Sequence, residues 1–424
     1  MRKTLIIAAG FVALAVGAAV LPSVDAVDTV VAKMTGRVTI PVPPAHPMSP
    51  YARAKYDAER TAALTAPDPV TGLPPLSAMI GQLLIVGFVG NELSDLPAQK
   101  LLVDIGEGRV GGIVYFGHNV ASLSDVQAMN RAFTAAAPQL PLLIAVDQEG
   151  GKVQRLNADN GFFDTPSAAD VAQLSVQERR KRYKALAEGL EGLGFNLNLG
   201  PVVDLGLEPT NTVVVTNGRT FGQDAGTVID AAADFIAAHR AVGITTALKH
   251  FPGHGSSLND SHSEAVDVSA TWSPVELTPY AALSKAGLAD MVMVGHLTLD
   301  PAVGPVSLAP NTIEAMLRGD LGFDGLMISD DLTMAGAQRG GERHPALDAI
   351  IAGNDLIIVS GLMDGLRGDL VDALHRLIAD AAEEDPALRQ RITDAFLRVA
   401  AFKLDRFEPP ARRAEIAAFG GKRL

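Results

Sequence analysis

The sequence predicts an α/β protein whose core is a single (β/α)8 barrel of the TIM type, and three observations support this fold. Eight short apolar runs, each of strand length, follow one another after residue 76. Alanine-rich, amphipathic intervals of helical length separate the runs. Ionisable residues stand at the ends of most of them, where a barrel of this kind carries its active site. A chain of 424 residues is long enough for one such barrel with additional segments.

Each apolar run predicts one strand, because a strand that helices cover on both faces is apolar along its whole length. The first four runs, from QLLIVGF to FNLNLGPVV, end at Phe88, Phe116, Val146 and Val203. The last four, GITTALK, MVMVG, GLMIS and NDLIIV, end at Lys249, Gly295, Ser329 and Val359. We expect one or two further helices between residues 364 and 407, packed on the outside of the barrel.

The chain before the barrel divides into two parts. Residues 1–26 begin with the cations Arg2 and Lys3 and continue as an uncharged apolar stretch, which predicts a signal peptide or a membrane anchor. Residues 27–75 become rich in proline and predict an extended linker or arm. The catalytic barrel is expected over 76–407 and a tail over 408–424. We therefore expect an exported protein, periplasmic or anchored to the membrane and facing outward.

Charge and cysteine content narrow the class of function. The formal net charge is −13 and no long basic run is present, so we expect no nucleic-acid partner. The chain has no cysteine, which excludes disulfides, thiolate zinc sites and cysteine nucleophiles. We expect a monomer that acts on a small substrate.

Polar residues at the ends of the predicted strands are the candidates for an active site. They are Asp147, Asp204, Lys249, His250, His296, Asp330 and Asp331. One acidic residue in such a place could equally cap the next helix. Agreement at several strand ends favours a site.

The segment KHFPGHGSSLNDSH, from Lys249 to His262, is the most unusual stretch of the chain. It follows a predicted strand directly and crowds three histidines, a lysine and an aspartate into one loop. Gly253 and Gly255 allow backbone conformations that other residues avoid, and Pro252 fixes one dihedral angle. Such a concentration of ionisable groups indicates chemistry rather than a simple connection.

The sequence resembles the glycoside hydrolase family 3 β-N-acetylglucosaminidases of the bacterial cell-wall recycling type. KHFPGHG, NDSH and ISDDLTM carry the resemblance, and DQEGGKVQR, NLGPVVDL, NGRTFG and AGNDLI extend it in the same order. Together they cover the chain from about Leu76 to Leu404.

The resemblance implies the catalytic residues. Asp330, the first acidic residue after the seventh strand, corresponds to the nucleophile, which forms a covalent glycosyl ester. Asp331 is its rival by spacing, and we assign it to orienting the loop. His262 corresponds to the general acid/base, and Asp260 to the carboxylate that fixes its tautomer.

The resemblance also implies that Asp147, Arg219, Lys249 and His250 bind the sugar. For Arg219 an alternative is a buried ion pair with a carboxylate, and for His250 a hydrogen-bonded place in the core. His254 is expected to hold the loop rather than to touch substrate.

The implied function is that of a retaining exo-β-N-acetylglucosaminidase, without metal or organic cofactor, acting on peptidoglycan fragments or related oligosaccharides. The chain departs from the family pattern at Ser256-Ser257, where Asp-Thr is usual, at His118, where arginine is commoner, and in its exported-looking start. Two alternatives remain open: a metal-dependent barrel hydrolase that uses the histidines of the loop as ligands, and a non-catalytic sugar-binding wall protein on the same scaffold.

Overall fold

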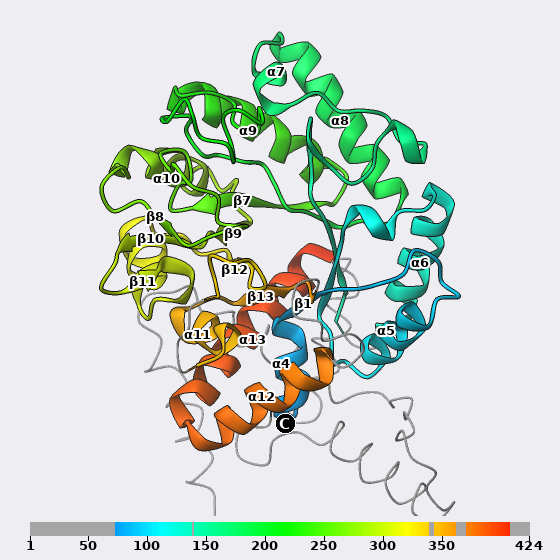
Figure 1. The fold of residues 1–424 in the computed structure, drawn as a ribbon. Helices are drawn as coiled ribbons and strands as arrows, with labels where there is room; N and C mark the ends of the chain where they lie inside the picture. Colours follow the sequence, from blue (N-terminus) through cyan, green and yellow to red (C-terminus); the bar gives the residue numbers. More distant parts are fainter. Residues whose placement is uncertain (1–72, 138–139, 339–342, 362–369, 408–424) are drawn as a thin grey trace, which may run out of the picture.

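The structure, a computed structural model, describes residues 73–137, 140–338, 343–361 and 370–407 (Figure 1). The predicted signal or anchor segment, nearly all of the proline-rich arm and the predicted tail lie outside the described residues. Among the described helices none is both long and apolar enough to cross a membrane.

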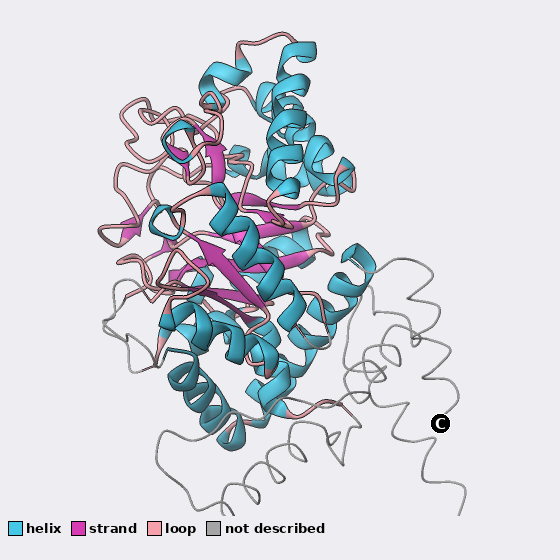
Figure 2. Cartoon of the chain, turned by 90° about the vertical axis from the view of Figure 1, so that its right-hand side faces the viewer, coloured by secondary structure: helices cyan, strands magenta, loops and turns pink. Residues whose placement is uncertain are grey.

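Eight parallel strands close into a barrel in the order β1-β13-β12-β9-β7-β6-β3-β2, so all eight predicted strands are confirmed. The helices surround the strands on the outside (Figure 2). The strands are β1 (Leu84–Gly87), β2 (Gly112–Tyr115), β3 (Leu143–Val146), β6 (Leu197–Asn198), β7 (Thr245–Phe251), β9 (Met291–Val294), β12 (Leu326–Asp331) and β13 (Leu356–Val359).

The fourth strand, β6, is much shorter than its apolar run suggests. Pro201 has no N–H group to donate to a neighbouring strand, and beyond it only an isolated bridge joins Val202 to Lys249. The chain still continues along the barrel to Asp204, which reaches the same end of the barrel as the other predicted site residues.

Helices connect most successive strands, and two more follow the last strand as expected. Side chains cap several of their first turns: Ser122 accepts from Asp125 N, and Asp224 from Thr227 N. The helices are α4 (Leu76–Leu83), α5 (Leu96–Gly106), α6 (Leu123–Ala136), α7 (Ala168–Ala172), α8 (Val176–Gly192), α9 (Ala225–Ala241), α10 (Thr278–Lys285), α11 (Pro345–Ala352), α12 (Leu370–Glu384) and α13 (Pro386–Phe407). A π-helix, Glu314–Asp320, stands between β9 and β12.

Alternation along the strands divides the core into two layers. Val114, Leu143 and Met293 belong to a cluster inside the barrel, whereas Ile113 and Ile144 pack against the surrounding helices. Both layers are apolar, which explains why the strand sequences are apolar runs rather than alternating ones.

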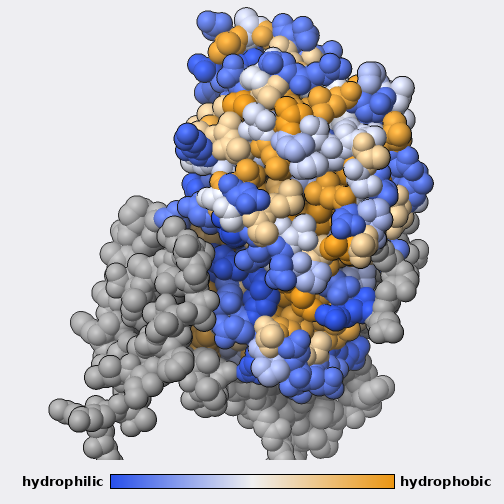
Figure 3. Space-filling model, turned by 90° about the vertical axis from the view of Figure 1, so that its left-hand side faces the viewer, coloured by the Kyte–Doolittle hydropathy of each residue, from blue (hydrophilic) through white to orange (hydrophobic). Residues whose placement is uncertain are grey.

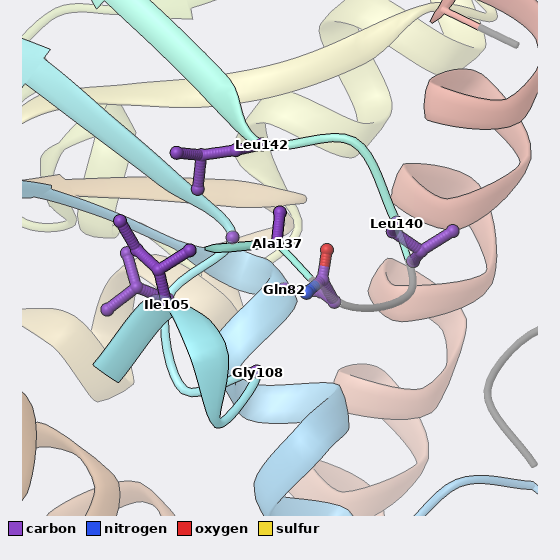
Figure 4. Close-up of a pocket in the computed structure, with 8 residues that line it drawn as sticks. Gln82, Ile105, Gly108, Ala137, Leu140 and Leu142 are labelled. Carbon is purple, nitrogen blue, oxygen red and sulfur yellow. The ribbon is translucent and has the colours of Figure 1, made fainter. Parts of the chain in front are cut away.

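The last helix closes the amino-terminal end of the barrel. Val399 of α13 joins the interior cluster, and the buried Lys403 donates to Gln82 Oε1 of α4 and to the carbonyl of Gly111 just before β2. A cavity of about 10 Å³, room for about one water molecule, lies beside Gln82 at this end (Figure 4).

Two small sheets were not predicted, and both are built on loops at the opposite end of the barrel. One pairs β4 (Gln148–Gly150) with β5 (Val153–Gln154), and the other has the order β11-β10-β8. The second consists of β8 (Val266–Asp267), β10 (Leu297–Asp300) and β11 (Gly304–Pro305). On the side of the molecule where this sheet and α10 lie, apolar patches are scattered among polar ones (Figure 3).

Candidate active site

A cavity of about 410 Å³ opens at the carboxyl ends of the barrel strands. All seven residues predicted for catalysis or sugar binding line it, although they come from four different strand ends of the barrel. They are Asp147, Arg219, Lys249, His250, Asp260, His262 and Asp330. The structure therefore brings together groups that are up to 183 residues apart in the chain, the difference between positions 147 and 330.

Of the carboxylates that the structure describes in the cavity, Asp330 has the fewest hydrogen-bond and ion-pair partners. It lies at the end of β12, and among the described residues no lysine, arginine or histidine nitrogen forms an ion pair with it; one oxygen accepts from the N–H of Asp331 at 2.8 Å. Desolvation alone would raise the pKa of Asp330, but the rings of His250, His296 and His262 together lower it. It is therefore ionised at neutral pH.

The carboxylate of Asp331, in contrast, already accepts three hydrogen bonds. It accepts from Thr333 N at 3.0 Å, from Thr333 Oγ1 at 2.9 Å and from Ser360 N at 3.0 Å. These bonds fix the turn after β12, which agrees with the orienting role expected for Asp331. Spacing could not separate the two aspartates, but their hydrogen bonds do.

Asp260 and His262 form a close pair at the rim of the cavity. Asp260 Oδ1 lies 2.7 Å from His262 Nδ1 and also accepts from the backbone N–H of His262 at 2.9 Å. Desolvation would raise the pKa of Asp260, but its bonds to His262 lower it, so the carboxylate is ionised and places the ring hydrogen on Nδ1. The other nitrogen, Nε2, is then free to exchange a proton, and the side chain is 59% exposed.

A buried ion-pair network forms the floor of the cavity. Lys249 Nζ lies 2.7 Å from Asp147 and 2.6 Å from Glu149, and Arg219 makes two parallel bonds of 2.9 Å to Glu149. Arg155 reaches the other oxygen of Asp147 at 3.2 Å. The alternative raised for Arg219, a buried ion pair, is thus present, and Arg219 nevertheless lines the cavity.

His250 links this network to a second buried carboxylate. It follows Lys249 through a cis peptide bond. Its Nδ1 lies 2.7 Å from Asp204 Oδ2, and its Nε2 lies 3.3 Å from Arg219 Nη2. Asp204 also accepts from the backbone N–H of His254 at 2.8 Å. His250 is therefore both hydrogen-bonded in the core, as its alternative suggested, and exposed to the cavity at one edge.

The base of the loop between β7 and β8 packs closely against the chain at Leu205. A Cβ at Gly255 would lie only 1.5 Å from the carbonyl oxygen of Leu205, so no larger residue fits there. Glu276, in the short 3-10 helix Pro274–Leu277, accepts from Gly255 N at 3.0 Å and from Ser256 Oγ at 2.5 Å. Ser256, one of the departures from the family pattern, is thus a partner of a buried carboxyl group.

Sequence reasoning missed three residues of the site. Glu149 and Arg155 stand within DQEGGKVQR, only two and eight positions after Asp147. Charged side chains so close in sequence to a predicted site residue were a signal that could have identified them. Glu276 gave no signal, since it lies in an unremarkable segment beyond the loop. His296, noted at a strand end, lies behind the cavity and bonds Ser307 Oγ and the carbonyl of Asp331.

Within the described part of the chain, no group of three or more histidine, aspartate or glutamate side chains is placed to hold a metal ion. His250, His254 and His262 share a loop, but their ring nitrogens are directed to separate partners, Asp204, Ser257 and Asp260.

Comparison with known proteins gives a consistent result. The model of the glycosyl hydrolase family 3 N terminal domain matches residues 76–400. The beta-hexosaminidase of Stenotrophomonas maltophilia (strain K279a) is 36% identical over 310 residues, which cover 69% of this chain and 86% of that protein.

Solved structures agree with the sequence comparison. The beta-N-acetylhexosaminidase from Beutenbergia cavernae DSM 12333 has a TM-score of 0.70 and 31% identity, over 77% of this chain and 98% of that one. The family 3 beta-N-acetylglucosaminidase from Paenibacillus sp. str. FPU-7 has a TM-score of 0.66 and 29% identity, over 82% of this chain and 68% of that one.

Proposed function

Because the chain belongs to glycosyl hydrolase family 3, and is thus a glycoside hydrolase, we propose that it is a retaining exo-β-N-acetylglucosaminidase that removes terminal β-linked N-acetylglucosamine. The observation that carries the proposal is that Asp330, a carboxylate with no ion-pair partner among the described residues, and His262, an imidazole bound to a carboxylate, line one cavity from different strand ends. One supplies a nucleophile and the other a proton carrier, which a retaining mechanism needs.

In the first step Asp330 attacks the anomeric carbon and forms a glycosyl ester, while His262 gives the proton on Nε2 to the departing oxygen. In the second step the neutral imidazole takes a proton from water, the water oxygen bonds to the anomeric carbon, and Asp330 leaves as a carboxylate. Asp260 remains ionised throughout and stabilises the imidazolium form.

The ion-pair network provides the sugar-binding surface. Asp147, Lys249 and Arg155 present charged donors and acceptors to the cavity, and hydrogen bonds to charged groups are the stronger ones for neutral hydroxyls. Because these groups already hold one another in place, they bind a sugar without first being ordered.

The natural substrate we propose is a fragment of peptidoglycan, or a related oligosaccharide, met outside the cytoplasm. The charged and apolar amino terminus of residues 1–26 supports export. Cell fractionation with an antibody to the barrel tests the location, and comparison of muropeptides with chitobiose tests the substrate. Protein found only in the cytoplasm would contradict the export proposal.

The central test is the Asp330→Ala variant. Aryl N-acetylglucosaminide should be cleaved by the unaltered protein and aryl glucoside poorly, and the variant should lose about 10⁴-fold or more in kcat because the ester cannot form. Proton NMR should show the β-anomer as the first product. Asp324→Ala, at an exposed position before the same strand, is the matched control and should behave as the unaltered protein. Normal turnover by Asp330→Ala would refute the assignment.

A further inference from the structure

Between the two partly exposed members of the Asp260–His262 pair lies a buried residue, Ser261, to which the proposed mechanism gives no role. Ser261 is 2% exposed, whereas the side chains on either side of it are 39% and 59% exposed. A polar residue that is buried next to an exposed catalytic pair needs hydrogen-bonding partners for its side chain and its backbone, and the structure provides one for each.

The first partner is His254, at the base of the same loop. His254 Nε2 lies 3.2 Å from Ser261 Oγ, and its Nδ1 lies 2.6 Å from Ser257 Oγ. Ser257 Oγ also accepts from Asn211 Nδ2 at 3.1 Å and lies 3.0 Å from the carbonyl oxygen of His254, so serine hydroxyls hold both ring nitrogens of His254. Burial and the neighbouring His250 lower the pKa of His254 to about 4, so the ring is neutral, and its Nε2 shares one hydrogen bond with the hydroxyl of Ser261.

The second partner belongs to the segment that follows the proposed nucleophile. The N–H of Gly336 donates to the carbonyl oxygen of Ser261 at 3.0 Å. The two backbones are in close contact, since a Cβ on Gly336 would lie 3.0 Å from that oxygen and 3.3 Å from the Cβ of Ser261. This bond joins the loop after β7 directly to the turn after β12.

We propose that Ser261 is a positioning residue that sets His262 against Asp330. Its hydroxyl fixes the loop to the buried His254, and its carbonyl fixes the loop to Gly336, six residues beyond Asp330. The next residue along the chain is His262, so a shift of Ser261 moves the acid/base ring directly. Proton transfer depends steeply on such placement, whereas among the described residues Ser261 itself makes no hydrogen bond to a sugar-binding side chain.

This inference rests on the proposed function, and a double-mutant cycle tests it. Four proteins are compared: unaltered, Ser261→Ala, His262→Ala and the double variant. The kcat and KM of each are measured with 4-nitrophenyl and phenyl N-acetylglucosaminide, which have a good and a poor leaving group. In the unaltered background Ser261→Ala should lower kcat on the phenyl glycoside by about 10-fold or more, with KM little changed. In the His262→Ala background it should cost no more than about 2-fold.

Controls separate positioning from folding. Ser269→Ala, at an exposed position just after β8, should stay within about 2-fold of the unaltered protein. Gly336→Ala displaces the same carbonyl contact from the other side and should reproduce the preference for good leaving groups. Circular dichroism and thermal unfolding establish that each variant is folded.

The outcomes are distinct. A loss from Ser261→Ala that is the same with and without His262, or is equal on both glycosides, or is absent, overturns the positioning role and leaves the proposed function intact. If the unaltered protein releases no N-acetylglucosamine, or if His262→Ala is fully active on the phenyl glycoside, the proposed function fails and this inference fails with it.

Discussion

At the scale of single residues, the carboxylates of the site differ in how many hydrogen-bond and ion-pair partners they already have. Glu149 and Asp147 are held by lysine and arginine side chains, and Asp331 by three hydrogen-bond donors. Each of these carboxylates would have to give up its partners to attack a substrate. Asp330 would give up only a bond to a neighbouring backbone N–H, which is why we propose it, and not one of the others, as the nucleophile.

The role of His262 leads to a prediction about leaving groups. Replacing His262 by alanine should lower kcat/KM about 10²-fold to 10⁴-fold for chitobiose or phenyl N-acetylglucosaminide, because their leaving oxygens need a proton. The loss should be much smaller for the 4-nitrophenyl glycoside, whose leaving group departs as a stable anion. A series of aryl glycosides measures this, and equal losses across the series would count against a proton-transfer role.

The site residues that could be predicted from the sequence are mainly those that belong to contiguous motifs. Asp260 and His262 are two positions apart, and the strand that carries Asp330 is followed by a recognisable turn, so their placement could be foreseen. The partner of Arg219 could be anticipated only as an unnamed carboxylate, because Glu149 lies 70 positions away and only the closed barrel brings them together. Glu276 was missed because it lies in an unremarkable segment, 20 positions from its partner Ser256.

At the scale of elements, the loop between β7 and β8 depends on a carboxyl group that titrates near neutral pH. Burial, with help from the charge of Asp204, raises the pKa of Glu276 to about 7 despite its bond from Ser256. An acid whose pKa is raised on folding stabilises the folded state fully below its unfolded pKa, and that contribution is lost as the pH rises through about 7.

Replacing Glu276 by glutamine should therefore change stability in a pH-dependent way. Glutamine cannot ionise, so the free energy of unfolding of Glu276→Gln relative to the unaltered protein should rise between pH 5 and pH 8, by on the order of 1–3 kcal/mol. Thermal or urea unfolding across this range measures the difference. Glu264→Gln, at an exposed position near the same loop, is the control. A difference that stays constant with pH would show that Glu276 keeps an ordinary acidity.

The strength of the sequence signal also differed among elements. The barrel strands are buried on both faces, so their apolar runs predicted all eight. β8 and β11 have only two residues each, and β10 ends in the exposed Asp300. Such short pairings arise because the loops are already brought side by side, and no periodicity in the sequence marks them.

At the scale of the whole molecule, the barrel keeps catalysis and closure at opposite ends. The carboxyl ends of the strands hold the cavity, whereas α13 covers the amino ends with Val399 inside the barrel. The sequence predicted a helix packed outside but not this closure, because nothing local indicates that the last helix meets the first elements. The contact between Lys403, Gln82 and Gly111 spans 321 and 292 positions of the chain.

Because α13 closes the end of the barrel that is remote from the cavity, replacing Lys403 should lower the stability of the protein without lowering its catalytic activity. Lys403 is fully buried, and Lys403→Met would keep most of its volume while leaving Gln82 Oε1 and the Gly111 carbonyl without that donor. Each buried acceptor left unsatisfied costs about 1–3 kcal/mol, so losing the donor to both should lower the free energy of unfolding by about 2–6 kcal/mol. Lys403→Ala should fall further, because it adds a cavity. Urea unfolding followed by the fluorescence of the single tryptophan, Trp272, measures both.

The activity of the folded fraction should not change, because Lys403 and its partners Gln82 and Gly111 lie at the opposite end of the barrel from Asp330. The expected result for Lys403→Met is therefore a lowered unfolding midpoint with kcat/KM, per folded molecule, within about 2-fold of the unaltered protein. Lys181→Ala, at an exposed position on α8, should change the unfolding free energy by no more than about 0.5 kcal/mol. If Lys403→Met were as stable as the unaltered protein, the barrel would be closed by apolar packing of α13 alone. If it kept its stability but lost activity, the two ends of the barrel would be coupled, contrary to the separation argued from their contacts.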